Sequence, residues 1–159
     1  MKRLIRLNSA GLNSLPAEVS VPAYDRSRIK AGIVHIGPGA FHRSHQAYFT
    51  HQVFQQGGST NWGICVVGLL DPDKKIIETL KEQDGLYTLV TAEQDGSINA
   101  MIMGSIVEYL HAPDDRDAII AKIAHPDTKL ITLTITEGGY NYDSNNGEFR
   151  INDHSIQYD

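Results

Sequence analysis

The segment Ile33–Phe49 decides the fold, and it reads IVHIGPGAFHRSHQAYF. It overlaps a short apolar, partly β-branched run, Gly32–Ile36, which predicts a buried strand. Gly37-Pro38-Gly39 predicts a tight turn, and the stretch from Ala40 to Gln56, which has no glycine or proline, predicts a helix. We therefore expect a strand that turns sharply into a helix.

This turn has the features of a dinucleotide-binding loop. Unpaired backbone N–H groups at a helix N-terminus attract a pyrophosphate, and the close approach of the backbone excludes Cβ atoms at two positions. Gly37 and Gly39 supply these positions, whereas the third glycine of the common G-x-G-x-x-G pattern is replaced. The predicted cofactor contacts are Ile36, Gly37, Pro38, Gly39, Ala40, Phe41, His42 and Arg43. The alternative is an ordinary strand-to-helix turn without a ligand.

His42 occupies the position of the third glycine, and Arg43 beside it is a fixed cation that can reach a phosphate or a ribose. His42 and His45 also have the i, i+3 spacing that could place two imidazoles on one metal ion. The sequence offers no third ligand, and Arg43 would oppose a cation. We expect instead that one histidine packs under the cofactor and that the other bonds to the backbone.

A second apolar run, Trp62–Leu70, ends at Asp71-Pro72-Asp73 and predicts a strand that leads into a helix over Lys74–Glu82. An acidic residue at the end of the second strand accepts hydrogen bonds from the adenosine ribose and repels a 2′-phosphate. Asp71 fits this place, with Asp73 in reserve, and it favours NAD over NADP. The alternative is that Asp71 only caps the next helix.

The remaining segments predict a hairpin, a helix and a strand. The hairpin is expected from Gly85–Thr91 and Ser97–Tyr109, which flank Gln94-Asp95-Gly96. Aspartates at the front of Asp114–Ala124 suit a helix dipole, and Leu130–Thr136 is a third strong strand. This alternation predicts an α/β fold, Rossmann-like and doubly wound, whose mostly parallel sheet carries an antiparallel hairpin insertion.

Ligands of doubly wound sheets lie beyond the carboxyl ends of the strands. Thr136 and Glu137 follow the third strong strand, so we expect them beside the nicotinamide half of the cofactor. The alternative at this position is a plain glycine turn.

Composition excludes several classes of protein. The chain has 159 residues, of which 41% are hydrophobic and 21% charged, as expected of a soluble globular domain. No apolar run approaches the ~20 residues of a membrane helix, and we expect no secretory signal. The net charge of −5, without a basic run, argues against nucleic-acid or membrane binding. The single cysteine, Cys65, lies in an apolar run that favours a buried, inert thiol and a reducing, cytoplasmic setting.

The run GPGAFHRSHQAYF resembles the signature of the polyol-specific long-chain dehydrogenase/reductase family, which includes mannitol 2-dehydrogenases and fructuronate reductases. The family turn reads G-x-G-x-F-H-R-A-H-Q, and Ser44 replaces its alanine here. WGICVVGLL, QDGLYTL and LTITEGGY resemble the same family in the same order, so the resemblance covers roughly residues 30–142. The ending resembles the mannitol 2-dehydrogenase branch. Gly138 departs from the family, whose members usually carry lysine there.

The resemblance implies a metal-free, NAD-dependent oxidoreductase that moves hydride between nicotinamide and an open-chain polyol or a sugar acid. The family's catalytic lysine, asparagine and histidine lie on a helical C-terminal domain, and no K-x-x-x-x-N-x-x-H motif occurs here. We expect an irregular leader (1–28), a dinucleotide-binding domain (29–142) and a polar tail (143–159) leading toward an absent substrate domain. No catalytic residue is assigned, and exposed apolar surface favours self-association. The alternative is a non-catalytic module with NAD as a regulatory ligand.

Overall fold

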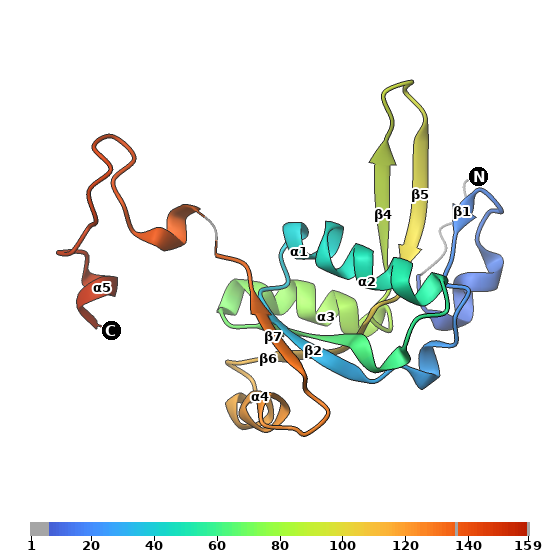
Figure 1. Cartoon of the computed structure of the whole chain (residues 1–159), viewed down its shortest axis with the longest axis horizontal. Coiled ribbons are helices and arrows are strands. Elements are labelled where there is room, and N and C mark those ends of the chain that lie inside the picture. The colour runs from blue at the N-terminus through green and yellow to red at the C-terminus, as the bar shows by residue number, and fades with distance from the viewer. Residues whose placement is uncertain (1–6, 136, 159) are drawn as a thin grey trace.

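Four parallel strands form the central sheet in the computed structural model, which describes residues 7–135 and 137–158 (Figure 1). The strands are β2 (Ala31–Ile36), β3 (Gly63–Gly68), β6 (Ile106–His111) and β7 (Leu130–Leu133). Their order is β6-β3-β2-β7. The chain therefore runs outward from β2 through β3 to β6 and then crosses back to the other side of β2, which creates the switch point of a doubly wound sheet. The predicted Rossmann-like fold is confirmed.

Helices cover both faces of this sheet (Figure 1). On one face lie α1 (Ala40–Ser44), α2 (Gln46–Gln55) and α3 (Lys74–Glu82), and on the other lies α4 (Arg116–Ile123). Parallel neighbours cannot be joined by a tight turn, so each pair needs a crossover of this kind. Shorter helices are η1 (Ser9–Ser14), η2 (Arg26–Arg28), η3 (Thr60–Trp62), η4 (Asp71–Asp73), η5 (Glu137–Tyr140) and α5 (His154–Tyr158).

Two apolar clusters, one on each face, hold the helices to the sheet, because alternate side chains of a strand point to opposite faces. The cluster under α2 and α3 consists of Ile33, Ala47, Ile64, Val66, Ile77, Leu80 and Ile106. The cluster under α4 consists of Ala31, Val34, Cys65, Val67 and Ile119. Burial raises the pKa of the Cys65 thiol to about 12, which agrees with an inert cysteine.

An antiparallel hairpin of β4 (Tyr87–Ala92) and β5 (Ile98–Met103) projects from the body (Figure 1). β1 (Val19–Ser20) pairs in parallel with β5, so the small second sheet has the order β1-β5-β4. The hairpin is confirmed, but the prediction of one strand over Ser97–Tyr109 is wrong. That stretch divides into β5 and β6, which belong to different sheets.

The division is caused by a contact from far away in the sequence. The guanidinium of Arg26 donates hydrogen bonds to the carbonyl oxygens of Gly104 (3.0 Å) and Ile106 (3.1 Å), on either side of the corner. A Cβ atom at Gly104 would press on Pro22 and on Arg26 itself. The chain therefore changes sheets at a glycine that lets the arginine approach.

The helix predicted over Ala40–Gln56 is also interrupted, at His45, whose φ of −120° and ψ of −85° are not helical. The Ser44 hydroxyl donates to the carbonyl of Ala40 at 2.9 Å, and Nδ1 of His45 donates to the carbonyl of Phe41 at 2.9 Å. Such side-chain bonds compete with the backbone bonds of a helix and bend it. α1 and α2 are therefore separate helices.

After β7 the chain leaves the sheet (Figure 1). The described part of this tail contains η5, an isolated bridge between Tyr142 and Phe149, and α5. The backbone hydrogen bonds within its described residues join nearby positions, as between Asp143 and Glu148. None of the helices in residues 7–135 and 137–158 has the length and apolar character needed to cross a membrane.

Replacing Gly32 by alanine is expected to destabilise the fold. The new Cβ atom would overlap the backbone carbonyl of Asn61, which cannot swing aside as a side chain does. Overpacking of this kind costs about 1–3 kcal/mol, so we expect urea denaturation to show a loss near the upper end of this range.

Gly39→Ser is the matched control. A Cβ atom at Gly39 meets no heavy atom within 4 Å, and serine is favoured at a helix N-cap. Its free energy of unfolding should stay within about 0.5 kcal/mol of the parent. If the two variants prove equally stable, the packing argument at Gly32 is wrong.

Candidate functional site

The carboxyl ends of the parallel strands meet at one edge of the sheet, and the predicted site residues follow three of those ends. Ile36 ends β2, and the turn and α1 come directly after it. Asp71 follows β3 at the start of η4. Thr136 lies outside the described residues, and for Glu137 only the backbone is described, as the first residue of η5. The topology therefore brings the β2 and β3 segments to a common edge.

The backbone conformation requires glycine at position 37 but not at position 39. Gly37 has a φ of 105°, in the left-handed region that other residues rarely adopt, and its N–H donates to the Val67 carbonyl at 2.8 Å. Gly39 has a φ of −61° and is the exposed N-cap of α1. The backbone thus requires glycine at position 37, whereas at position 39 a side chain would occupy only the open space in front of the helix.

The glycine turn is held by a contact between Arg43 and its backbone, and Tyr87 in turn bonds to Arg43. The Arg43 guanidinium donates to the carbonyl of Pro38 and lies 6.0 Å from the centre of the Tyr87 ring. The Tyr87 hydroxyl donates to the Arg43 carbonyl at 2.6 Å. Burial raises the pKa of Tyr87 above its usual range, so the ring remains a neutral donor. The hairpin insertion therefore fixes α1 in place.

The remaining residues of the turn divide between the surface and the interior. Ala40 and Phe41 are exposed, and the Phe41 ring stacks on His45 with 4.1 Å between ring centres. His42 is buried and stacks on His35 of β2, with ring centres 3.6 Å apart and planes inclined by 9°. His42 therefore fills the space between helix and strand that the third glycine of the common pattern would leave empty.

Both stacked rings are held in the neutral form. Burial, helped by the neighbouring His35 and the Arg43 cation, lowers the pKa of His42 to about 3. Burial also lowers the pKa of His35. His35 and His42 are therefore uncharged at neutral pH. Among the described side chains of α1, Arg43 is then the one that carries a positive charge.

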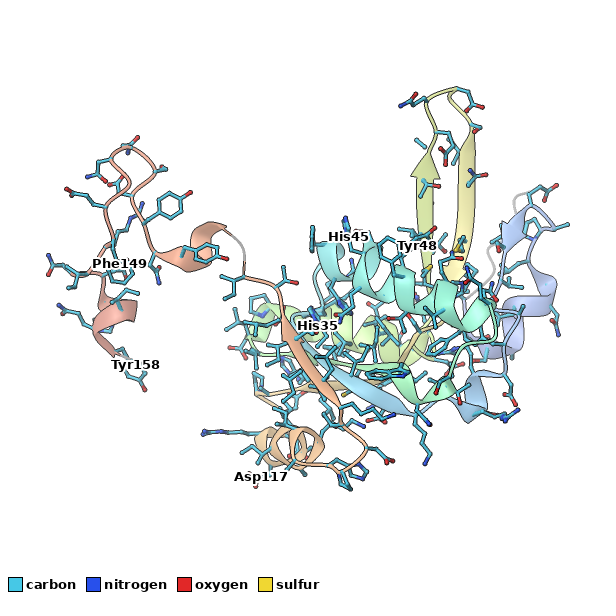
Figure 2. All side chains as sticks on the ribbon, viewed as in Figure 1. His35, His45, Tyr48, Asp117, Phe149 and Tyr158 are labelled. Carbon is cyan, nitrogen blue, oxygen red and sulfur yellow. The ribbon has the colours of Figure 1, made fainter. Side chains whose placement is uncertain are left out.

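A hydrogen-bond chain joins this pair to β7. Nδ1 of His35 lies 2.8 Å from the Thr132 hydroxyl oxygen, and that hydroxyl donates to Oε1 of Gln46 at 3.0 Å. Because the hydroxyl has one proton, Nδ1 of His35 must be the donor to it. Figure 2 shows His35 close to β7 and α1.

Sequence reasoning missed His35, Thr132 and Gln46. A signal was present, because His35 is the one polar side chain in β2 and Thr132 the one polar side chain in β7. A polar side chain in a buried strand such as β2 needs a partner, and Thr132 is the polar side chain of the neighbouring strand. The sequence does not show that His35 and Thr132 form a hydrogen bond with each other.

The surroundings of His42 and His45 do not suit a shared metal ion. His42 is stacked in the interior, whereas His45 is exposed and its Nδ1 bonds to the backbone of Phe41. The parallel rings of His35 and His42 cannot both point a nitrogen lone pair at one ion. Within the part of the chain that the structure describes, no three His, Cys, Asp or Glu side chains come together as a metal cage.

Asp71 and Asp73 separate into different roles. The Asp73 carboxylate accepts hydrogen bonds from the backbone N–H groups of Leu69 (3.0 Å) and Leu70 (3.1 Å), so it shapes the loop. Asp71 is exposed, and no hydrogen bond or ion pair holds its carboxylate among the described residues. The capping alternative therefore applies to Asp73, and Asp71 is left with an open carboxylate.

Charges beside Asp71 are already paired. Lys74 forms an ion pair with Asp114 at 3.0 Å, and Asp114 also lies 3.1 Å from Nδ1 of His111. Although burial opposes it, the Leu70 carbonyl and Asp114 raise the pKa of His111. Lys74 is thus held by Asp114 rather than by Asp71.

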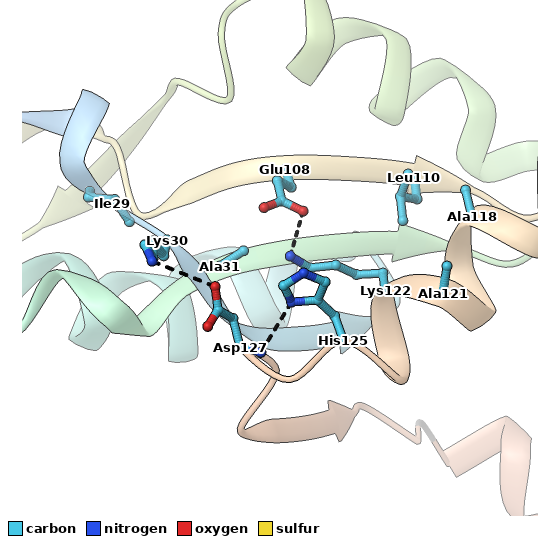
Figure 3. Close-up of a pocket in the computed structure, with 10 residues that line it drawn as sticks. All are labelled: Ile29, Lys30, Ala31, Glu108, Leu110, Ala118, Ala121, Lys122, His125 and Asp127. Carbon is cyan, nitrogen blue, oxygen red and sulfur yellow. Dashed lines mark hydrogen bonds and ion pairs between the residues drawn. The ribbon is translucent and has the colours of Figure 1, made fainter.

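A cavity of about 590 Å³ lies elsewhere, between α4 and strands β2 and β6 (Figure 3). Its charged side chains pair with each other, Lys122 with Glu108 at 2.7 Å and Lys30 with Asp127 at 3.7 Å. None of the predicted site residues lines it. We therefore keep the edge at Gly37 as the candidate site, since its backbone geometry is specialised and the cavity's charges are already paired.

The family model of the mannitol dehydrogenase Rossmann domain matches residues 31–152. The chain belongs to the mannitol dehydrogenase family. The glycine turn, the stacked histidines, Asp71 and β7 all lie inside the matched range. The residues matched by the family model thus include those at the carboxyl ends of β2 and β3 that form the candidate site.

Relatives and solved structures agree with this membership. The chain is 47% identical to a mannitol 2-dehydrogenase of Neosartorya fischeri, over 98% of this chain and 32% of the relative, and 46% identical to one of Aspergillus niger. The Pseudomonas fluorescens mannitol 2-dehydrogenase in ternary complex with NAD and D-mannitol matches 96% of this chain with a TM-score of 0.84 and 42% identity. A substrate-free D-sorbitol dehydrogenase matches 96% of this chain with a TM-score of 0.80 and 37% identity.

This member of the mannitol dehydrogenase family spans about a third of the length of the relatives it matches: 32% and 33% of the two curated enzymes, and 31% and 32% of the two solved chains. The activity of those whole enzymes is therefore a separate question from the fold of this chain.

Replacing Asp73 and replacing Asp71 should have unequal effects on the free energy of unfolding. Asp73→Ala removes the acceptor of two backbone N–H groups and is expected to lower the free energy of unfolding by about 1–2 kcal/mol. Asp71→Ala removes an exposed side chain and should change it by less than about 0.5 kcal/mol. Thermal or urea unfolding of both variants measures this, and a larger loss in Asp71→Ala would reverse the two assignments.

Proposed function

We propose that this chain is the NAD-binding part of a polyol dehydrogenase that transfers hydride between NAD(H) and a polyol or ketose, such as mannitol and fructose. The observation that carries the proposal is the left-handed Gly37 turn at the switch point between β2 and β7. Family membership supports it, as does the likeness to a mannitol 2-dehydrogenase whose structure contains NAD and D-mannitol.

In this proposal the segment Ile36–Arg43 binds the pyrophosphate, because α1 begins behind the exposed Gly39 and the Arg43 cation lies beside the turn. Asp71 accepts hydrogen bonds from the adenosine ribose and repels the 2′-phosphate of NADP. Thr136 and Glu137 border the nicotinamide half, beyond the end of β7. The nicotinamide ring of bound NAD supplies the hydride acceptor.

The chain supplies only the cofactor side of the reaction. Hydride transfer also needs a base within hydrogen-bond reach of the alcohol proton, and a substrate held at near-attack distance. We assign neither role to a residue of this chain. The polyol or sugar acid is bound by further polypeptide, as the greater length of the relatives suggests.

The proposed contact surface for that polypeptide, or for a second copy, is the free edge of β7. Leu130, Ile131 and Leu133 are 42%, 46% and 57% exposed, and within the described part of the chain the strand pairs only with β2. An uncharged, apolar edge strand favours pairing with another chain. We place this protein in a reducing, cytoplasmic setting, which would keep Cys65 as a thiol.

Cofactor selectivity tests the assignment of Asp71. We expect NADH to bind at least about tenfold more tightly than NADPH, because the Asp71 carboxylate repels a 2′-phosphate. In Asp71→Ala this preference should fall to about twofold or less, mainly through weaker NADH binding. Fluorescence titration of both cofactors on both proteins measures the four affinities.

Two further variants serve as controls for the titration. Asp117→Ala removes an exposed carboxylate from α4, on the opposite face of the sheet (Figure 2), and should leave both affinities unchanged. Gly39→Ser should weaken NADH and NADPH alike, because its side chain enters the space in front of α1. Equal affinity of the parent for both cofactors would remove the role given to Asp71.

The chain by itself is expected to bind NAD⁺ but not to oxidise mannitol. No base is assigned to it, and a general base alone contributes typically about 10²–10⁴-fold to such a rate. Absorbance of NADH at saturating NAD⁺ and D-mannitol should stay at the level of a protein-free control. Sustained NADH formation by this chain would show that a complete site exists within it.

A further inference from the structure

The stacked pair His35 and His42 is unusual because the protein leaves much of its hydrogen-bonding capacity unused. Both rings are 2% exposed. Among the described residues no hydrogen bond of good geometry reaches Nε2 of His35 or either ring nitrogen of His42. The Gln46 amide still interacts with both rings, and the Gly37 backbone interacts with His35. Buried polar atoms without good hydrogen bonds destabilise a fold, so a purely structural site would be better filled by phenylalanine. Their presence calls for a reason other than stability.

The position of the pair supplies that reason. His35 is the second-last residue of β2, and His42 is on the first helix after the glycine turn. Through Thr132 and Gln46 the same pair is bonded to β7 and to α2. Thus β2, α1, α2 and β7, which surround the switch point, are joined by two rings and two hydrogen bonds.

We propose that His35, His42, Thr132 and Gln46 form a positioning cluster that holds the glycine turn at a fixed distance from β7, and that acid releases the cofactor by protonating this cluster. The inference rests on the proposed function and extends it, because it assigns residues that set the geometry of the site and the condition that opens it. In this proposal the side chains of the four residues do not touch the cofactor, and the buried His42 takes part in the binding turn only through its backbone. They act through the backbone of Gly37–Arg43 and of β7.

No anionic group faces the two rings among the described residues. From α1 the Arg43 cation acts against protonation of His42, and each ring acts against protonation of the other. The Gln46 amide from α2 raises the pKa of both rings and the Gly37 backbone raises that of His35, but burial outweighs both effects. From β7 comes the neutral hydroxyl of Thr132. None of these is an anion that could pair with an imidazolium.

The direction of the pH effect follows from linkage. A histidine exposed by local opening has the ordinary pKa of 6.5, whereas burial lowers the pKa of His42 to about 3 in the closed site. The closed form is therefore fully favoured above pH 6.5 and loses its advantage as the pH falls toward 3. With two rings involved, the dissociation constant should rise by up to about two decades per pH unit once the open form dominates.

The first experiment measures NAD⁺ binding by calorimetry between pH 8 and 4.5, with far-UV circular dichroism to show that the fold persists. NAD⁺ is used because NADH decomposes in acid. We expect the parent to lose at least tenfold in affinity over this range. His42→Gln, with one titrating ring fewer, should show about half the limiting slope of log Kd against pH. His35→Gln is the second variant in case His42→Gln fails to fold.

His51→Gln is the matched control for this measurement. His51 is also buried, and burial lowers its pKa to about 4, but it bonds to Tyr24 and Gly104, away from the turn. Its loss should change acid stability without changing the slope of NAD⁺ binding. If His51→Gln and His42→Gln give the same slope as the parent, the cluster has no part in acid release.

The second experiment tests positioning at neutral pH. Thr132→Val removes the hydroxyl bridge but keeps the shape of the side chain, and we expect it to weaken NAD⁺ binding about fivefold to tenfold at pH 7.5. Thr91→Val, an exposed threonine on β4, is the control and should bind as the parent does. Unchanged affinity in Thr132→Val would overturn the positioning role while leaving the proposed function intact.

Failure of the proposed function gives a different result. In that case the parent does not bind NAD⁺ even at pH 7.5, and the claim of acid-controlled cofactor release falls with it. The positioning claim is then judged by NMR of the free protein, where the Gly37 and Gly39 amide signals should move with the His42 ring as it titrates. If the chemical shifts of the Gly37 and Gly39 amides do not change while His42 titrates, the positioning role is overturned as well.

Discussion

The structure depends on β2, which is paired on both edges and buried on both faces. Its side chains belong to the cluster under α2 and α3 on one side and to the cluster under α4 on the other. Such a strand must be apolar along almost its whole length. It must also leave the sheet sharply, because α1 packs back on the sheet immediately afterwards. The left-handed conformation at Gly37 meets that second requirement, and the candidate site is its consequence.

At the carboxyl end of β2, two polar side chains are buried in otherwise apolar surroundings. His35 and His42 stack where a smaller residue would let the helix approach more closely. The spacing between α1 and β2 is therefore set by two flat rings, and the orientation of one ring is set by Thr132 of β7. Elements on both sides of the switch point are coupled through a few side chains rather than through the general packing of the core.

The parts of the chain outside the central sheet act on the site from a distance. Tyr87, at the base of the projecting hairpin, bonds to the backbone of α1, and Arg26 makes the corner that separates the hairpin from β6. These contacts join residues far apart in the sequence. They explain why the hairpin insertion is compatible with a parallel sheet, since the corner at Gly104 returns the chain to the sheet with the correct direction.

The sequence by itself determined the α/β class, the strand–turn–helix at Gly37 and the helix over Lys74–Glu82, because alternation, apolar runs and glycine conformations are local properties. Only the tertiary structure decided where the strand after Ser97 changes sheets, where the helix after Gly39 is interrupted, and which of Asp71 and Asp73 keeps an open carboxylate. The same holds for the pairing of His35 with His42 and Thr132. Each of these outcomes depends on a hydrogen bond or a packing contact that local pattern could not specify, in most cases because its partner is distant in the sequence.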